Sequence, residues 1–407
     1  AALVMAWKRG VGSLLALLLA VSRRCGGETD ARSASGITRI AFGSCSKQWL
    51  PQPLWQVIGE LHPELWIWTG DAAYVAEGED VAAQHRALED ARQNSNYTTF
   101  LESGVHVNGI WDDHDLGAND GGAETFDIAR QHAFLRFLGA PPEDSRWTRP
   151  GLYTSILHGA GPQSVKIILL DTRSFRRRPG PIYFPLNGQP WPIMNLIGRL
   201  VTGLAASFLP GEESDVLGEE QWQWLIDELN GSEASVHILV SSIQVLTPNP
   251  FFESWGHWPR AKKRLLELLS DTAPAGLVVV SGDVHFAEVR GWEVTSSGLT
   301  HSCAVGACAQ LPALGHSVCS AFIGLFHGSW GADGLAYPGV NFGTLDVDWA
   351  RGKIEVAVRD GKGAIVLRTI RAIGTPEGSR ESPALEPAAV LVGVALCAVA
   401  AASLALR

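Results

Sequence analysis

The sequence predicts an α/β fold, and three observations lead to this class. Short runs of consecutive apolar residues, typical of strands covered on both faces, alternate with amphipathic segments of helical spacing. Hydrophobic residues make up 46% of the 407 residues and charged residues only 18%, so the chain can bury a large core. The 44 glycines and 22 prolines would interrupt long helices, which excludes a coiled coil. The net charge of −10 argues against a nucleic-acid-binding surface, which needs basic side chains.

The alternation of these patterns gives the order of the elements. Apolar runs predict strands at residues 37–42, 65–69, 105–111, 165–170, 236–240 and 277–280. Helical spacing predicts helices at 53–61, 125–138, 219–229 and 261–269, with Gly231 closing the third helix. Further strands are expected at 341–349, 354–359 and 365–370, the last two joined by a turn at 360–363. Residues 179–210 are Pro-rich and then apolar, and we interpret them as an insertion or lid, either a packed loop or a helix touching a membrane.

The amino-terminal segment has the pattern of a secretory signal. An apolar run at residues 11–21 follows the basic residues Lys8 and Arg9, and it is too short to span a bilayer comfortably. We therefore predict a signal peptide within residues 1–25, with Met5 as an alternative start and an uncleaved anchor as the alternative function.

The carboxyl-terminal segment predicts attachment to a membrane. Residues 375–387 have the composition of a linker, and residues 388–406 are free of charge. This tail is predicted to be either a transmembrane helix or the signal for a GPI anchor. We expect a protein of the secretory pathway that is either membrane-anchored at the cell surface or extracellular. The glycosylation sequons at Asn96 and Asn230 are compatible with that location.

Polar residues follow nearly every predicted core strand at its carboxyl end, which is where ligands bind in open α/β sheets. Taken singly, each has a simpler explanation, such as a turn or a helix cap. The three carboxylates within residues 112–115 are harder to explain, because they repel one another unless a cation neutralises them. Together the clusters predict a site for more than one metal ion. They are Gly43-Ser44-Cys45, Gly70-Asp71 with Tyr74, Asp112-Asp113-His114-Asp115 with Asn119 and Asp120, Asp171-Thr172-Arg173, Ser241-Ser242-Ile243-Gln244 and Gly282-Asp283-Val284-His285.

This ordered set, continued through the stretch from Thr295 to His301, resembles the alkaline phosphatase D (PhoD-like) family of calcineurin-like metallophosphatases. The resemblance covers about residues 37–370, and we expect a PhoD-like domain over 37–372. It implies two mixed β-sheets packed as a sandwich and flanked by helices, in four layers. It also implies a secreted phosphomonoesterase or phosphodiesterase that uses iron and calcium.

The resemblance also implies roles for individual residues. Cys45, Asp71 and Tyr74 would hold ferric iron (Fe³⁺), and Asp71 would bridge to calcium (Ca²⁺). The other metal ligands that we expect are Asp113, Asp115, Asn119, Asp120, Asp283 and His285. Zinc or manganese would be the alternative metals. Gln244 stands where broader metallophosphatases carry a metal-binding His, and this change suits an oxygen-rich site for hard cations.

These residues predict a metal-dependent phosphoric ester hydrolase. A metal-bound hydroxide would attack phosphorus, His114 or His285 would protonate the leaving alkoxide, and Arg173 would bind non-bridging phosphate oxygens. His301 could contact the substrate or make a structural hydrogen bond. We expect an alkaline phosphatase that acts on small phosphomonoesters. One alternative is a phosphodiesterase for lipid headgroups or nucleotides, and the other is an inactive surface binding protein with the same fold.

Two remaining features of the composition concern the core and the cysteines. The chain has 15 tryptophans, several of them beside the polar clusters, and we expect most to fill the core rather than to stack on a substrate.

Among Cys303, Cys308 and Cys319 we expect one disulfide and one free thiol, and the sequence does not give the pairing.

Overall fold

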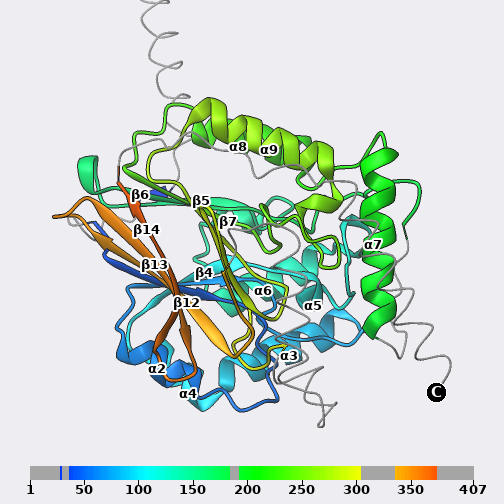
Figure 1. The fold of residues 1–407 in the computed structure, drawn as a ribbon. Coiled ribbons are helices and arrows are strands. Elements are labelled where there is room, and N and C mark those ends of the chain that lie inside the picture. Colours follow the sequence, from blue (N-terminus) through cyan, green and yellow to red (C-terminus); the bar gives the residue numbers. More distant parts are fainter. Residues whose placement is uncertain (1–27, 30–35, 184–191, 304–334, 374–407) are drawn as a thin grey trace, which may run out of the picture.

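Two mixed β-sheets form the centre of the fold in the computed structural model, which describes residues 28–29, 36–183, 192–303 and 335–373 (Figure 1). In this part of the chain one sheet has eight strands in the order β1-β5-β6-β7-β8-β10-β9-β11. The other has six strands in the order β14-β13-β12-β2-β3-β4. Strands β6, β7, β8 and β10 are parallel, as are β2, β3 and β4, and both sheets also contain antiparallel pairs. The predicted sandwich of mixed sheets is therefore confirmed.

The strands of the eight-stranded sheet are β1 (Glu28–Thr29), β5 (Thr154–His158), β6 (Val165–Leu169), β7 (Val236–Val240), β8 (Val278–Ser281), β9 (Ala287–Arg290), β10 (Glu293–Ser296) and β11 (Leu335–Tyr337). Those of the six-stranded sheet are β2 (Arg39–Gly43), β3 (Leu65–Thr69), β4 (His106–Ile110), β12 (Asn341–Asp348), β13 (Lys353–Asp360) and β14 (Ile365–Ala372). The helices of three residues are η1 (Ala123–Thr125), η2 (Ser145–Trp147), η3 (Gly161–Gln163) and η4 (Trp255–His257). The longer helices are α2 (Leu54–Glu60), α3 (Val81–Gln93), α4 (Ser95–Glu102), α5 (Asp113–Leu116), α6 (Ile128–Leu138), α7 (Pro192–Phe208), α8 (Gly218–Leu229) and α9 (Pro259–Thr272).

Most of the apolar runs form buried strands because these strands face a core on both sides, whereas β4 is buried only at its carboxyl end. In β3, Leu65 and Ile67 face the other sheet, whereas Trp66 and Trp68 lie in the core under the helices. This follows from the two-residue period of a strand, which sends successive side chains to opposite faces. The core between the sheets contains mainly Ile, Val and Leu from both sheets. Helices α2, α3, α4 and α6 cover one outer face, and α8 and α9 cover the other, which gives the four predicted layers.

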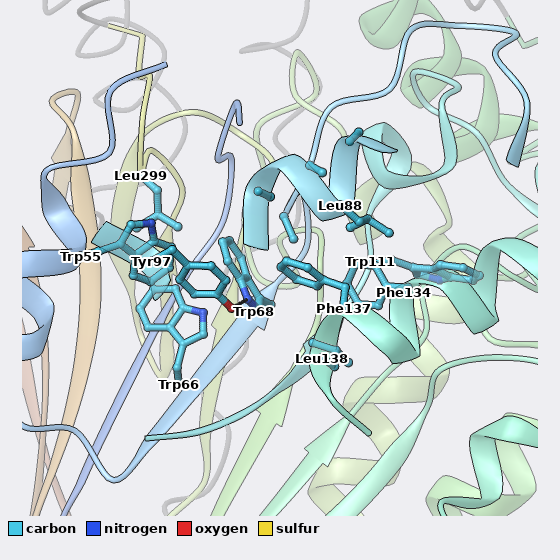
Figure 2. Close-up of a cluster of buried hydrophobic side chains, with 14 of the residues drawn as sticks. Trp55, Trp66, Trp68, Leu88, Tyr97, Trp111, Phe134, Phe137, Leu138 and Leu299 are labelled. Carbon is cyan, nitrogen blue, oxygen red and sulfur yellow. Dashed lines mark hydrogen bonds between the residues drawn. The ribbon is translucent and has the colours of Figure 1, made fainter. Parts of the chain in front are cut away.

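Aromatic side chains fill the core beneath the ends of β3 and β4 (Figure 2). The Trp66 and Trp68 rings lie edge to face, with centroids 5.5 Å apart, and Trp68 Nε1 donates to the Tyr97 hydroxyl at 3.1 Å. Trp111 is fully buried, and its Nε1 donates to Asp171 Oδ1 at 3.1 Å. These tryptophans fill the core, as predicted.

Residues 179–210 contain a long helix, α7, which lies along one side of the molecule (Figure 1). It packs against η4, where His257 Nε2 lies 3.0 Å from the carbonyl oxygen of Arg199. Of the two structures expected for this segment, the helix is the one observed. Its membrane contact stays a prediction.

Several sequence predictions concern residues outside the described part of the chain. These are the signal peptide, the linker, the membrane tail, Cys308 and Cys319. Within the described residues, no helix combines the length and the apolar character needed to cross a membrane.

Candidate metal centre

The carboxyl ends of parallel strands from both sheets meet at one place. Cys45 follows β2, Asp71 follows β3 and Asp113 follows β4, all in the six-stranded sheet. Asp283 and His285 follow β8 of the eight-stranded sheet. Gly282 allows this approach, because a Cβ atom there would lie 2.5 Å from Ser44 Oγ and 2.7 Å from the Thr69 carbonyl oxygen. The two sheets therefore converge on one set of side chains.

Left-handed backbone conformations concentrate in this set. Among the described residues, seven non-glycine residues have positive φ, and five of them are predicted metal ligands. Because this conformation costs a non-glycine residue roughly 1–2 kcal/mol, it persists where the surrounding structure imposes it, commonly at functional sites. The five are Cys45 (63°), Asp71 (52°), Asp120 (55°), Asp283 (71°) and His285 (60°).

The three residues expected to hold iron lie in contact. Cys45 Sγ is 3.3 Å from Asp71 Oδ2, and the Tyr74 hydroxyl donates to the same oxygen at 2.9 Å. The Tyr74 hydroxyl also lies 3.2 Å from His285 Nε2. One ligand atom from each of Cys45, Asp71 and His285 falls within 4.8 Å of the others, so the three could share a cation. Thiolate, phenolate and imidazole ligands suit a transition metal.

Asp71 and Asp113 connect this group to a run of carboxylates. Three further groups have ligand atoms within 4.8 Å of one another: Asp71–Asp113–His114, Asp112–Asp113–Asp283 and Asp113–Asp120–Glu253. Asp71 belongs to two of the four groups and Asp113 to three, so each is placed to bridge cations. Oxygen-rich groups of this kind suit hard cations such as Ca²⁺.

The electrostatics of the cluster favour a bound cation. Burial, followed by the charge of Asp113, raises the pKa of Asp71 well above its usual value, and burial likewise raises the pKa of Asp283. Burial and the Asp71 carboxylate also raise the pKa of the Cys45 thiol. Asp71 Oδ1 and Asp112 Oδ2 are buried without any hydrogen-bond partner. Buried carboxylate oxygens of this kind are satisfied when they bind a cation, so the residues fit a metal centre.

Asp115, a predicted metal ligand, binds backbone amides through both carboxylate oxygens. Its Oδ1 accepts from the Ala73 amide at 3.0 Å and its Oδ2 from the Asp112 amide at 2.9 Å, and it belongs to none of the four groups. The structure thus uses Asp115 to join the loops after β3 and β4. Asn119 is half-buried in the loop that leads to Asp120.

Arg173 also differs from its predicted role as a phosphate ligand. Its side chain is fully buried, its Nε donates to Asp112 Oδ1, and its Nη2 lies 2.7 Å from Glu253 Oε2. Neighbouring Arg176 is buried too and pairs with Glu253 Oε1 at 2.5 Å. Because both guanidinium groups are bound to protein acceptors away from solvent, they fix the carboxylates and do not reach a substrate.

Three histidines surround Tyr74. The His114 ring stacks on the Tyr74 ring with centroids 4.2 Å apart. His301 Nε2 lies 3.2 Å from the Tyr74 hydroxyl, and the His285 and His301 ring centroids are 4.5 Å apart. Burial, followed by the electrostatic influence of His114, lowers the pKa of His285 to about 3. Burial, followed by the influence of His285, lowers the pKa of His301 to about 2. Both imidazoles are therefore neutral, the form that binds metals.

Three residues beside the cluster were not predicted as site residues. Glu253 lies in the loop between β7 and η4, far from any strand end, and no motif marked it. Arg199 lies on α7, and its Nη2 pairs with Asp120 Oδ1 at 2.6 Å. Arg199 interrupts an otherwise uncharged helix, which is the signal that could have revealed it. Asp112 belonged to the acidic motif but was not among the predicted ligands.

Gln244, the residue expected to favour hard cations, is held within the eight-stranded sheet. Its Nε2 donates to Glu288 Oε2 at 2.7 Å and to Thr295 Oγ1 at 3.0 Å. Its Oε1 is buried without a hydrogen-bond partner. The amide nitrogen is therefore occupied by the protein, and the oxygen is the atom left for a ligand.

Comparison with known proteins agrees with the motifs. Residues 105–302 match the family model of PhoD-like phosphatases, which confirms the resemblance and supports a phosphatase. The matched range begins after Cys45, Asp71 and Tyr74. A solved structure of PhoD superimposes with a TM-score of 0.57 at 14% identity and covers 93% of this chain and 79% of its own, which shows the shared fold.

A second solved structure, of a Staphylococcus aureus protein designated a 5′-nucleotidase and bound to α-ketoglutarate, has a TM-score of 0.37 at 10% identity. The alignment covers 88% of this chain and 58% of the Staphylococcus aureus chain. No curated protein matches the chain.

Proposed function

We propose that this protein is a metal-dependent phosphatase that hydrolyses small phosphate monoesters. The observation that carries the proposal is the sharing of Asp71 between the Cys45–Asp71–His285 group and the Asp71–Asp113–His114 group. Two neighbouring groups with a common carboxylate are the arrangement that a two-metal phosphoester hydrolase needs.

The residues divide into two sets by their donor atoms. Cys45, Asp71, Tyr74 and His285 would hold a transition metal, for which the motif resemblance suggests Fe³⁺. Asp71, Asp113, Asp120 and Asp283, together with Glu253, would hold harder cations such as Ca²⁺. When bound, such cations polarise a phosphoryl group and make water a stronger acid.

His114 is our candidate for the group that protonates the leaving alcohol. It is half-buried, and its ring is fixed by stacking on Tyr74. Burial lowers the pKa of His114 below its usual value, and the Asp113 carboxylate opposes this shift only in part. His285, in contrast, faces Cys45 and Asp71 and would be occupied as a ligand of the transition metal. In the Asp71–Asp113–His114 group, the two carboxylates would bind the second cation and leave His114 for proton transfer.

The proposal is tested by metal analysis and activity of purified protein. We expect iron and calcium in the protein and hydrolysis of 4-nitrophenyl phosphate that is faster than that of bis(4-nitrophenyl) phosphate. Asp71→Asn and Cys45→Ala should lower both metal content and activity, by about 100-fold or more for activity, because each removes a ligand. Asp90→Asn, on the exposed face of α3, is the matched control. Full activity and metal content in both site variants would refute the proposal.

One observation favours a second substrate class. Phe208 at the end of α7 is 79% exposed, and Leu209 beside it is 57% exposed. An exposed apolar pair at the end of the helix that carries Arg199 would suit a lipid phosphodiester, and the predicted membrane tail would bring the site to such a substrate. Faster hydrolysis of phospholipid headgroups in vesicles than of 4-nitrophenyl phosphate would favour this alternative.

A further inference from the structure

Helix α7 brings a single positive charge to the carboxylate cluster. Arg199 is the one charged residue between Pro192 and Phe208. Its Nη2 lies 2.6 Å from Asp120 Oδ1 and its Nε 3.3 Å from Asp120 Oδ2. A helix with one charge would be expected to turn it to solvent, whereas this helix turns it to the site.

The helix is fixed at the position of this residue. The Arg199 carbonyl oxygen lies 3.0 Å from Nε2 of the buried His257, and a Cβ atom on Gly203 would meet the same imidazole at 3.3 Å. The close packing of α7 on η4 therefore fixes the backbone from which the Arg199 side chain extends. A side chain anchored in this way loses less conformational entropy when it binds a ligand.

Among the described residues, three arginines contact the carboxylates of this cluster, and solvent access separates them. The side chains of Arg173 and Arg176 are 0% and 3% exposed, and that of Arg199 is 20% exposed. Arg173 and Arg176 pair with Glu253 and donate to backbone carbonyls, whereas the bonds described for the Arg199 side chain go to Asp120 alone. Arg199 is thus the guanidinium that an entering anion can reach.

We propose that Arg199 binds the phosphate group of the substrate, exchanging its pair with Asp120 for a bidentate pair with two non-bridging oxygens. The planar guanidinium fork matches phosphate as well as carboxylate, and a monoester dianion offers more charge than Asp120 does. This inference rests on the proposed phosphatase function. It gives Arg199 the role that the sequence had suggested for Arg173.

The test compares Arg199→Gln and Arg199→Lys with the wild type. We expect Arg199→Gln to raise both KM for 4-nitrophenyl phosphate and Kd for inorganic phosphate, measured by calorimetry, by about 10- to 100-fold. Arg199→Lys keeps the charge without the fork and should recover part of this loss. KM for bis(4-nitrophenyl) phosphate should rise less, because the diester carries only one negative charge. Arg177→Gln removes the same charge from an exposed position and should change neither constant.

Metal content and melting temperature are measured for every variant. Unchanged KM and phosphate Kd in Arg199→Gln, or an equal rise in Arg177→Gln, would overturn the inference. A lower melting temperature of Arg199→Gln with unchanged constants would identify the pair with Asp120 as structural. If the wild type binds phosphate but hydrolyses no ester, the proposed function fails and phosphate binding still tests Arg199.

Discussion

Individual residues in the metal centre are held in conformations that favour ligand geometry over stability. Asp71, which is buried, and Asp283, which is half-buried, combine a left-handed backbone with a carboxylate whose pKa is raised by desolvation and by neighbouring carboxylates. A carboxyl group with a raised pKa in the folded state binds a proton more tightly there than in the unfolded chain. Its ionisation near neutral pH therefore costs folding free energy until a cation offsets it.

Asp283→Asn tests this cost directly. Asn tolerates positive φ and removes the buried charge, so the chelator-treated variant should melt higher than chelator-treated wild type at pH 7. The gain should be about 2 °C or more for each kcal/mol recovered. With metals restored, the order should reverse, because the variant lacks one anionic ligand. Thermal unfolding monitored by circular dichroism gives the melting temperature with and without metals. An Asp283→Asn variant that is less stable than wild type in both conditions would contradict the argument.

Strand-end position was enough to predict most residues of the cluster, because parallel strands bring their carboxyl ends to one edge. It could not predict what each side chain binds. Asp115 and Arg173 lie where expected, but one binds backbone amides and the other binds Asp112 and Glu253. Glu253 and Arg199 come from a long loop and an inserted helix, and only tertiary packing places them.

At the scale of elements, predictions succeeded where one physical signal dominated. The run at 65–69 matches β3 and that at 236–240 matches β7, because these strands are buried on both faces. Gly231 closes α8 with φ of 71°, as expected of a residue after a helix end. Helix α3 was not predicted, because Leu88 is the one large apolar residue on its buried face, beside two alanines and Gln84. Strand β5 was missed because most of its side chains are half-buried.

The short helix η2 depends on a buried ion pair. Arg146 Nη2 lies 2.6 Å from Asp144 Oδ2, and its Nη1 donates to Asn108 Oδ1 on β4 at 3.1 Å. Burial opposes ionisation of Asp144, but the hydrogen bonds and charge of Arg146 outweigh it and hold the pKa below its usual value. The pair therefore stabilises the fold above pH ~4, and this contribution is lost as the pH falls through the lowered pKa.

Asp144→Asn should destabilise the protein by about 3 kcal/mol at pH 7, because it leaves the Arg146 charge buried without its partner. Urea unfolding at pH 7 and at decreasing pH measures the difference in free energy of unfolding between the variant and wild type, which should shrink below pH ~4. Asp90→Asn should change stability little, since Asp90 is exposed. A difference that stays constant with pH would show that the pair does not act through its charge.

At the scale of the whole molecule, the metal centre lies where the two sheets converge. Cys45, Asp71 and Asp113 extend from one sheet and Asp283 and His285 from the other. The Cys45–Asp71–His285 and Asp112–Asp113–Asp283 groups combine ligands from both sheets. The sequence predicted this sandwich through the resemblance of its motifs. Apolar periodicity alone gave an α/β core, since it does not tell which strands share a sheet.

Because a cation in either of these two groups would bind ligands from both sheets, metal binding should stabilise the sandwich as one unit. We expect chelation to lower the melting temperature of the whole domain in a single calorimetric transition, since a ligand that binds only the folded state adds stability. The free energy of unfolding should then rise with free Ca²⁺, by about 1.4 kcal/mol for each tenfold increase above Kd at one site, and the melting temperature should rise with it. Asp71→Asn should flatten this dependence, whereas Asp90→Asn should preserve it. A melting temperature that does not respond to iron, calcium, zinc or manganese would show that no cation joins the two sheets.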